Sequence, residues 1–182
     1  ATSASGGFIA TCAITVVVPV TGISLSASSA TLAPLATASL AATIAPSNAS
    51  NQSVSWSSSA ESVATVSSVG LVTAVADGSA AITATTADGG YQASCAVTVR
   101  TALTGIAFSA SSLVLTRGAT ATPAIVFTPA SATNKALDWS SADASVATVA
   151  SAGLGTGIGW GEAVISAVSA EGGHSATIAA RV

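Results

Sequence analysis

Residues able to do chemistry are few in this chain, and they are widely spaced. The single histidine, His174, follows the Gly172–Gly173 pair, which is typical of a tight turn and predicts an exposed side chain. Catalysis needs a nucleophile beside a base, a pair of carboxylates or a metal cluster. The sequence brings no such set together. We therefore expect that the protein is not an enzyme and has no catalytic residue and no cofactor.

The acidic residues support the same conclusion. Asp77, Asp88 and Glu171 flank predicted turns, and Asp138 and Asp143 stand near a tryptophan. A calcium site needs several converging oxygen ligands, with carboxylates at close spacing. The sequence contains no run of this kind, so we expect no metal site.

Composition narrows the class of partner. Only 6% of the residues are charged, and the formal net charge is −3, which disfavours nucleic acid. No apolar stretch reaches the roughly 18 residues that a membrane helix needs. Serine, threonine, asparagine and glutamine must supply the polar surface. Because a net charge near zero favours association, we expect neighbouring copies of the same domain or subunit as partners.

An internal repeat sets the domain organisation. A shift of 83 residues aligns residues 21–99 with residues 104–182 without a gap, and 37 of the 79 pairs are identical. A repeat of this length indicates two copies of one structural unit. We predict one domain over residues 21–100 and a second over residues 101–182.

The first twenty residues extend the repeat. Residues 1–16 align with residues 84–99 at the same shift, so residues 1–20 are predicted to form the closing hairpin of an incomplete preceding domain. Its inward row includes Cys12 and Val16. Because a lone hairpin is marginally stable in water, a preceding domain of the chain or another subunit must supply a facing sheet.

Apolar and polar residues alternate with a period of two within each copy, which is the pattern of half-buried strands. About seven short strands with regularly spaced turns indicate an all-β Greek-key sandwich. In the first copy we predict strands at residues 21–28 continuing at 31–35, then 37–44, 53–57, 63–66, 71–75, 79–86 and 91–99.

The two copies share a set of short motifs. In the first copy these are Trp56-Ser-Ser-Ser, Ser62-Val-Ala-Thr-Val66, Gly70-Leu-Val-Thr73, Gly78, Ile82-Thr-Ala84 and Cys95-Ala-Val-Thr-Val99. Together they resemble the group 2 bacterial immunoglobulin-like domain. The resemblance implies tandem immunoglobulin-like Greek-key β-sandwiches in an extracellular or cell-surface bacterial protein. Domains of this family occur in intimin- and invasin-type adhesins, surface-layer proteins and phage tail proteins.

Four positions are predicted to belong to the cores: Trp56, Trp139, Cys95 and Ile178. The tryptophans occupy one repeat position, and Ile178 takes the position of Cys95 in the second copy. Cys12 and Cys95 are also equivalent, so they are expected to lie about one domain length apart. Since a disulfide needs Cα atoms within about 7 Å, we predict free thiols that pack as small hydrophobes.

A row of alternating glycines distinguishes the second copy. Glycine falls at every second position from Gly153 to Gly161. On a strand these glycines, among them Gly155, Gly157 and Gly159, face one side, and Trp160 lies on the other. Glycine in a strand marks a bend or the close approach of another backbone. Gly155, Gly157, Gly159 and Trp160 are our candidate interface, and local tuning of the fold is the alternative.

The sequence supports two functions. The first is a non-catalytic structural module of an extracellular bacterial fibre, stalk, sheath or surface layer, with short linkers that make the array semi-rigid. The alternative is an adhesin that binds a receptor or carbohydrate, or a phage tail decoration domain. A host or cell-surface ligand would then contact exposed turn residues, for which the candidates are Asn48, Asn51, Tyr91 and His174.

Overall fold

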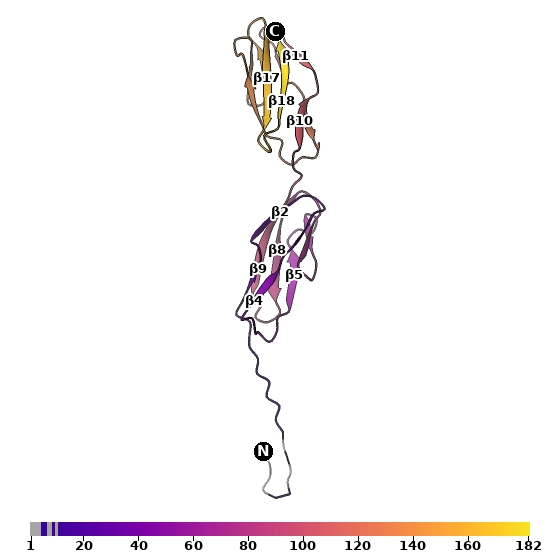
Figure 1. The fold of residues 1–182 in the computed structure, drawn as a ribbon, viewed down its shortest axis with the longest axis vertical. Helices are drawn as coiled ribbons and strands as arrows, with labels where there is room; N and C mark the ends of the chain where they lie inside the picture. The colour runs from indigo at the N-terminus through magenta and orange to yellow at the C-terminus, as the bar shows by residue number, and fades with distance from the viewer. Residues whose placement is uncertain (1–4, 7–8, 10) are drawn as a thin grey trace.

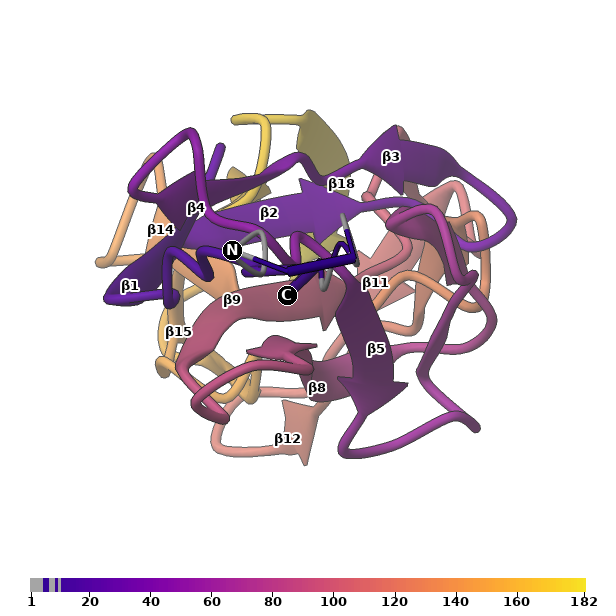
Figure 2. The same cartoon turned by 90° about the horizontal axis from the view of Figure 1, so that it is seen from below.

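Two β-sandwiches follow one another along the long axis of the molecule (Figure 1). The computed structural model describes residues 5–6, 9 and 11–182. Figure 2 looks along the long axis, and the two sandwiches overlap in that view. The described residues form strands and turns, and contain no helix long and apolar enough to cross a membrane. The predicted all-β immunoglobulin-like fold is confirmed.

The first domain contains nine strand segments, because two of the predicted strands are each broken in two. They are β1 (Gly22–Leu25), β2 (Ser29–Leu32), β3 (Thr37–Ser39), β4 (Ala42–Ala45), β5 (Val54–Ser58), β6 (Ala64–Val66), β7 (Leu71–Ala74), β8 (Gly78–Thr86) and β9 (Gln92–Val99).

The second domain repeats this order. Its strands are β10 (Gly105–Phe108), β11 (Ser112–Val114), β12 (Thr120–Ala121), β13 (Ile125–Thr128), β14 (Leu137–Ser141), β15 (Ala147–Val149), β16 (Gly155–Gly157), β17 (Glu162–Ser169) and β18 (Ser175–Arg181).

The breaks let one chain segment serve both layers of a sandwich. In the first domain, one sheet has the order β2-β9-β8-β5, and the other layer is built from β1-β4 and β3-β7-β6. β1 pairs with β4, whereas β2 crosses to the opposite sheet and runs parallel to β9. The predicted strand 37–44 breaks at Leu40, whose N–H donates to the carbonyl of Gly70. The second domain has the same pairings, including β11 parallel to β18.

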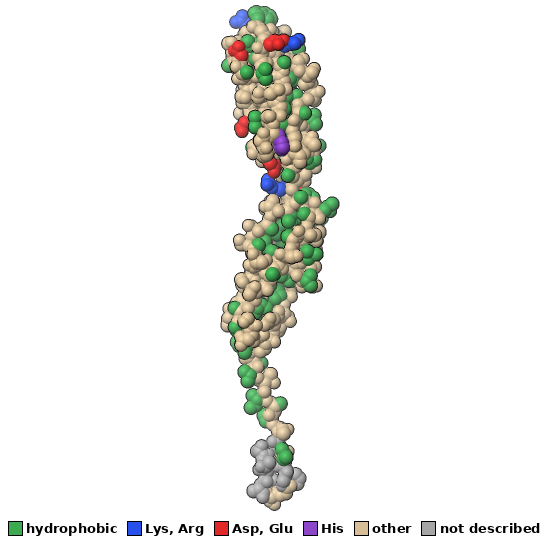
Figure 3. Space-filling model, viewed as in Figure 1, with side chains coloured by type: hydrophobic (Ala, Val, Ile, Leu, Met, Phe, Trp, Pro, Cys, Tyr) green, Lys and Arg blue, Asp and Glu red, His purple; other side chains and the backbone are tan. Residues whose placement is uncertain are grey.

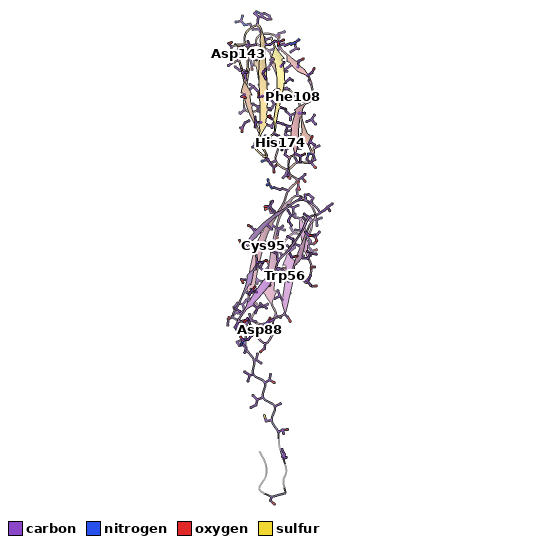
Figure 4. All side chains as sticks on the ribbon, in the orientation of Figure 1. Trp56, Asp88, Cys95, Phe108, Asp143 and His174 are labelled. Carbon is purple, nitrogen blue, oxygen red and sulfur yellow. The ribbon has the colours of Figure 1, made fainter. Side chains whose placement is uncertain are left out.

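The core of the first domain is small and closely packed. Ile82, Val97 and Val99 are almost fully buried between the sheets, with Cys95 beside them. Trp56 is half-buried and closes one side of this core (Figure 4). Its indole lies over the left-handed turn at Gly70, where a Cβ atom would come within 2.8 Å of Trp56 Cζ2.

The second domain has its own core, which shares no residue with the first. Ile165 and Ile178 are buried there. Trp139 is half-buried at the edge, as Trp56 is, and its ring meets Phe108 at a centroid distance of 5.9 Å. Because each sandwich buries a separate apolar cluster, each is a separate folding unit.

The glycine row belongs to this second core. Gly155 and Gly157 are buried and take the places of Val72 and Ala74 in the first domain. A Cβ on Gly155 would lie 3.2 Å from Leu113 Cδ2, and one on Gly157 would lie 2.8 Å from the Thr116 carbonyl oxygen. The close approach expected for the row is therefore made within the domain, and these buried glycines offer no surface to a partner.

The two cores distribute large and small side chains differently over their facing strands. Where the first domain has Val72 with Ala30, the second has Gly155 with Leu113. Phe108 likewise stands where the first domain has Leu25. Leu113 of β11 thus fills room that Gly155 of β16 leaves, and Phe108 of β10 packs against Trp139. A larger side chain on one strand offsets a smaller one on the facing strand.

The residues before the first sandwich differ from the expected hairpin. Part of the predicted closing hairpin, residues 1–4, 7–8 and 10, lies outside the described residues. Residues 11–19 carry no strand. Cys12 and Val16, expected on an inward row, are exposed, because no sheet in the described part of the chain faces them.

The packing of Trp56 on Gly70 generates a prediction. Trp56→Ala removes a large side chain from the edge of the core, and we expect a loss of about 3 kcal/mol in the free energy of unfolding of the first domain. Gly70→Ala is expected to destabilise the same domain, since Gly70 has φ +80° and faces the ring. Denaturant unfolding measures both. Gly22→Ala is the matched control because a Cβ there meets nothing within 4 Å, and equal losses at both glycines would contradict the packing.

The redistributed core generates a second prediction. Gly155→Val should destabilise the second domain by about 1–3 kcal/mol, because the added methyl groups overpack it against Leu113. Adding Leu113→Ala recreates the pair found in the first domain and should recover most of that loss. Thermal unfolding of the single and double variants measures the coupling. Purely additive losses would show that the two positions do not share one space.

Candidate functional site

The junction between the two sandwiches is where polar side chains gather. β9 ends at Val99 and β10 begins at Gly105, so the connection is only the segment 100–104. On the face shown in Figure 3, charged side chains lie at this junction and on the second domain. We call the end at which the chain enters a sandwich its base, and the opposite end its tip.

A carboxylate at the tip of the first domain binds the base of the second. Asp77 lies in the turn between β7 and β8. Its Oδ1 accepts a hydrogen bond from Thr101 Oγ1 at 3.1 Å, and its Oδ2 accepts one from Thr133 Oγ1 at 2.6 Å. Such bonds to an ionised group are stronger than those between neutral groups.

The two threonines are themselves held in place. The Thr101 N–H donates to Thr133 Oγ1 at 2.8 Å, and the Thr133 N–H donates to the Thr101 carbonyl at 2.9 Å. The Thr133 hydroxyl thus accepts from one backbone group while it donates to Asp77. This arrangement presents both hydroxyls to the carboxylate together.

A second set of contacts binds the linker to the second domain. Arg100 Nη1 is 2.8 Å from Glu171 Oε1, and the side chain of Glu171 is mostly buried. The Leu103 N–H donates to the other oxygen of Glu171 at 3.5 Å, and His174 Nε2 lies 3.3 Å from the Leu103 carbonyl. Leu103 is buried, so the turn after β17 packs on the linker and hydrogen-bonds to it.

A buried hydroxyl fixes this turn. Ser169 Oγ donates to the Glu171 carbonyl at 2.6 Å and accepts from the His174 N–H at 2.9 Å. The turn itself needs Gly172 and Gly173, which have φ +74° and +62°. The carboxylate and imidazole are therefore positioned by the closing hairpin of the sandwich.

The base of the first domain carries the same backbone arrangement without a domain before it in the described residues. The Val18 N–H donates to Ser50 Oγ, and the Ser50 N–H donates to the Val18 carbonyl, each at 2.9 Å. The Val20 N–H donates to Asp88 Oδ2 at 2.9 Å. Val18, Ser50 and Asp88 correspond to Thr101, Thr133 and Glu171 at the repeat distance.

The predicted exposed turn residues lie at these two bases. Asn48, Asn51 and Tyr91 are exposed on the base of the first domain. His174 corresponds to Tyr91 but is half-buried against the linker (Figure 4). The expectation that His174 is an exposed turn residue is therefore wrong, because the first domain precedes the turn and its linker covers the ring.

The candidate interface of the glycine row is also corrected. Gly155 and Gly157 are buried within their own sandwich, and a Cβ on Gly159 would lie 2.6 Å from the Ser145 carbonyl oxygen. The outward side of this segment carries other residues, among them Ile158 and Trp160. Only Trp160, with 76% of its surface exposed, remains a candidate for contact with a partner.

Titratable groups are dispersed over the described residues, where no group of three histidine, cysteine or acidic side chains could hold a metal ion. Burial raises the pKa of the Cys95 thiol. A hydrogen bond from the Ser145 hydroxyl lowers the pKa of Asp143, which is exposed and bonds the backbone of its own turn. Both shifts have structural causes.

An open groove lies beside the second core. It has a volume of about 490 Å³, and Phe127, Leu137 and Trp139 contribute to its lining. Lys135 also lines the groove, with its ammonium 5.6 Å from the centroid of the Phe127 ring. The groove runs between β13 and β14, the outer strands of their sheets.

The strand order and the end-to-end junction define a pair of immunoglobulin-like domains. The sequence model of the bacterial Ig-like domain (group 2) matches residues 19–97 and, a second time, residues 102–180. The two matches cover most of the chain, and the chain belongs to this family.

Several solved structures match this chain at low identity. Domains 1–6 of the surface layer protein SbsC match with a TM-score of 0.43 and 17% identity over 91% of this chain, which spans 28% of that structure. SbsC domains 4 and 5 match with a TM-score of 0.44 and 17% identity, over 91% of this chain and 99% of theirs. A mutant of intimin from EHEC O157:H7 matches with a TM-score of 0.33 and 24% identity over 43% of this chain and 41% of its own. No curated protein matches the chain.

Sequence reasoning placed the turns correctly but missed the residue that joins the domains. In the sequence, Asp77 is one of several acidic residues that flank predicted turns. Its partners, Thr101 and Thr133, are common residue types in a chain rich in threonine. The repeat held the available signal. A position near the linker that differs between the two copies is a candidate for a contact that only one copy makes.

The junction generates a prediction. Asp77→Ala removes the acceptor of both threonine hydroxyls, and we expect the two domains to reorient more freely while each stays folded. Residual dipolar couplings or small-angle scattering would report the loss of a single orientation. Asp138→Ala, which changes an exposed acid on β14, is the control. Unchanged interdomain order in Asp77→Ala would show that the carboxylate does not fix the junction.

Proposed function

We propose that this chain is a non-catalytic, semi-rigid module of an extracellular bacterial assembly, such as a fibre, stalk, sheath or surface layer. The observation that carries the proposal is the junction. A connection of five residues, 100–104, is bound by Asp77 of the first domain and Glu171 of the second, and Asp77 also binds Thr133 across the junction. A module that sets the distance and direction between its neighbours needs a junction with a restrained orientation.

The energetics favour a single orientation over a loose hinge. An ion pair with a half-exposed partner, such as Arg100–Glu171, contributes on the order of 0–1 kcal/mol. The hydrogen bonds to Asp77 act on a different part of the interface. Because the two contacts use different residues of a short linker, their combined effect on stiffness exceeds that of either contact alone.

The surface chemistry is consistent with a packed assembly. Charged residues make up 6% of the chain, against about 25% in an ordinary soluble domain. Repulsion between neighbouring copies is therefore weak. Among the described residues, no buried side-chain nitrogen or oxygen lacks a hydrogen bond, so these buried polar groups take part in holding the fold together.

A second function is favoured by one observation, the groove between β13 and β14. Its aromatic lining with Lys135 at the rim has the mixture of apolar walls and few polar groups that ligand sites show. An adhesin that binds a host or cell-surface ligand would use it. The turn at Glu171 and His174, in contrast, is occupied by the junction.

Immunogold microscopy of intact cells with antibodies against the 182-residue protein tests the proposal. We expect label along fibres or over a lattice on the cell surface. Label confined to the cytoplasm, or to protein dispersed in the medium, would contradict it. Lys135→Ala separates the two functions, because it should leave the assembly intact and would reduce adherence only if the groove binds a ligand.

A further inference from the structure

At the tip of the second domain, an aromatic side chain stands where the first domain has its junction carboxylate. Trp160 occupies the position of Asp77 at the repeat distance of 83 residues. Asp77 contacts the domain that follows it, whereas 76% of the Trp160 surface is exposed. Hydrophobic side chains are visible at this end of the molecule in Figure 3. Trp160 thus holds the repeat position from which Asp77 contacts the neighbouring domain.

This tip does not suit a base like that of the second domain. Thr101 and Thr133 there present two hydroxyls to a carboxylate. An indole has one N–H donor and no acceptor, so Trp160 cannot accept from either hydroxyl. Covering them with the ring would leave polar groups without partners, which costs free energy.

The base of the first domain differs at the corresponding places. Val18 replaces Thr101, so this base presents one hydroxyl, that of Ser50, where the other base presents two. The Ser50 hydroxyl accepts from the Val18 N–H, as the Thr133 hydroxyl accepts from the Thr101 N–H. Val17 replaces Arg100, and 65% of its surface is exposed. This base therefore offers valine side chains where the other base offers a guanidinium and a hydroxyl. Apolar surface of this kind suits an aromatic anchor.

The backbone that carries Trp160 is already fixed. The Val182 N–H donates to the Gly161 carbonyl at 3.0 Å. Arg117 Nε donates to the carbonyl of Ile158 at 2.9 Å. Because the segment is held on both sides of Trp160, little backbone order is lost when the ring meets a partner, which favours binding.

We propose that Trp160 anchors an end-to-end docking surface whose partner is an immunoglobulin-like domain with a base like that of the first domain, apolar at the positions of Val17 and Val18. The proposal rests on the structural role proposed above. It gives the assembly two kinds of joint, a polar one at Asp77 and an apolar one at Trp160. The Trp160 tip leaves fewer polar groups unmatched on the apolar base than on the polar one, and such differences are how interfaces reject wrong partners.

Two fusion proteins test the pairing. Both extend the full chain after Val182 by one more domain and keep the period of 83 residues. The first appends residues 17–99, with the apolar base, and the matched fusion appends residues 100–182, with the polar base. Each sandwich has its own core, so the appended domain folds as a unit.

The indole N–H resonance of Trp160, assigned with Trp160→Phe, reports docking. In the first fusion we expect it to shift and its exchange with solvent to slow about tenfold, which corresponds to about 1.4 kcal/mol. In the matched fusion we expect the resonance to stay as in the 182-residue protein. Trp160→Asp should reverse the preference, so that residual dipolar couplings show an ordered third domain only with the polar base.

The outcomes separate this proposal from the one on which it rests. The same response in both fusions, or none in either, would overturn the docking surface. The Asp77 junction is present in every fusion and serves as an internal reference. If that junction is ordered while the third domain moves freely in both fusions, the structural role stands and the Trp160 surface fails. If the Asp77 junction is itself disordered, the structural role fails.

Discussion

The segment from Arg100 to Thr104 is a short connection between the two sandwiches, and the contacts beside it restrain their relative orientation. Asp77 supplies one restraint through threonine hydroxyls, and Glu171 supplies another through the linker itself. The two sandwiches lie end to end in Figure 1. The proposed structural role requires these restraints, since domains on a free tether could not set each other's direction.

The restraints are placed by parts of the fold that both domains share. The closing hairpin positions an acidic residue over the incoming chain, as Asp88 does for Val20 and Glu171 for Leu103. One scaffold therefore serves at both bases, and a few side chains set its chemistry. The cores vary in the same way, since Gly155 and Leu113 replace Val72 and Ala30 while the strand pairing is kept.

Much of this fold could be predicted from the sequence. The repeat fixed the domain number, and the period of two located most strands, because both depend on local pattern. The break at Leu40 could not be predicted, since it arises from pairing with the distant Gly70. The glycine row was misassigned for a similar reason, because a strand pattern tells which residues share a face but not which face is inward. His174 was misjudged because its burial depends on a linker residue, Leu103, that lies far from it in the sequence.

The parallel pairing of β2 with β9 determines how each sandwich responds to tension along its axis. β2 follows the strand that enters from the base, and β9 leads out through the tip. A pull on the two ends of the domain therefore slides these strands past each other and strains their hydrogen bonds together, in shear. In an antiparallel hairpin pulled from its open end, the bonds would break one at a time. The second domain repeats this geometry with β11 and β18, so a chain of such modules resists stretching at every unit.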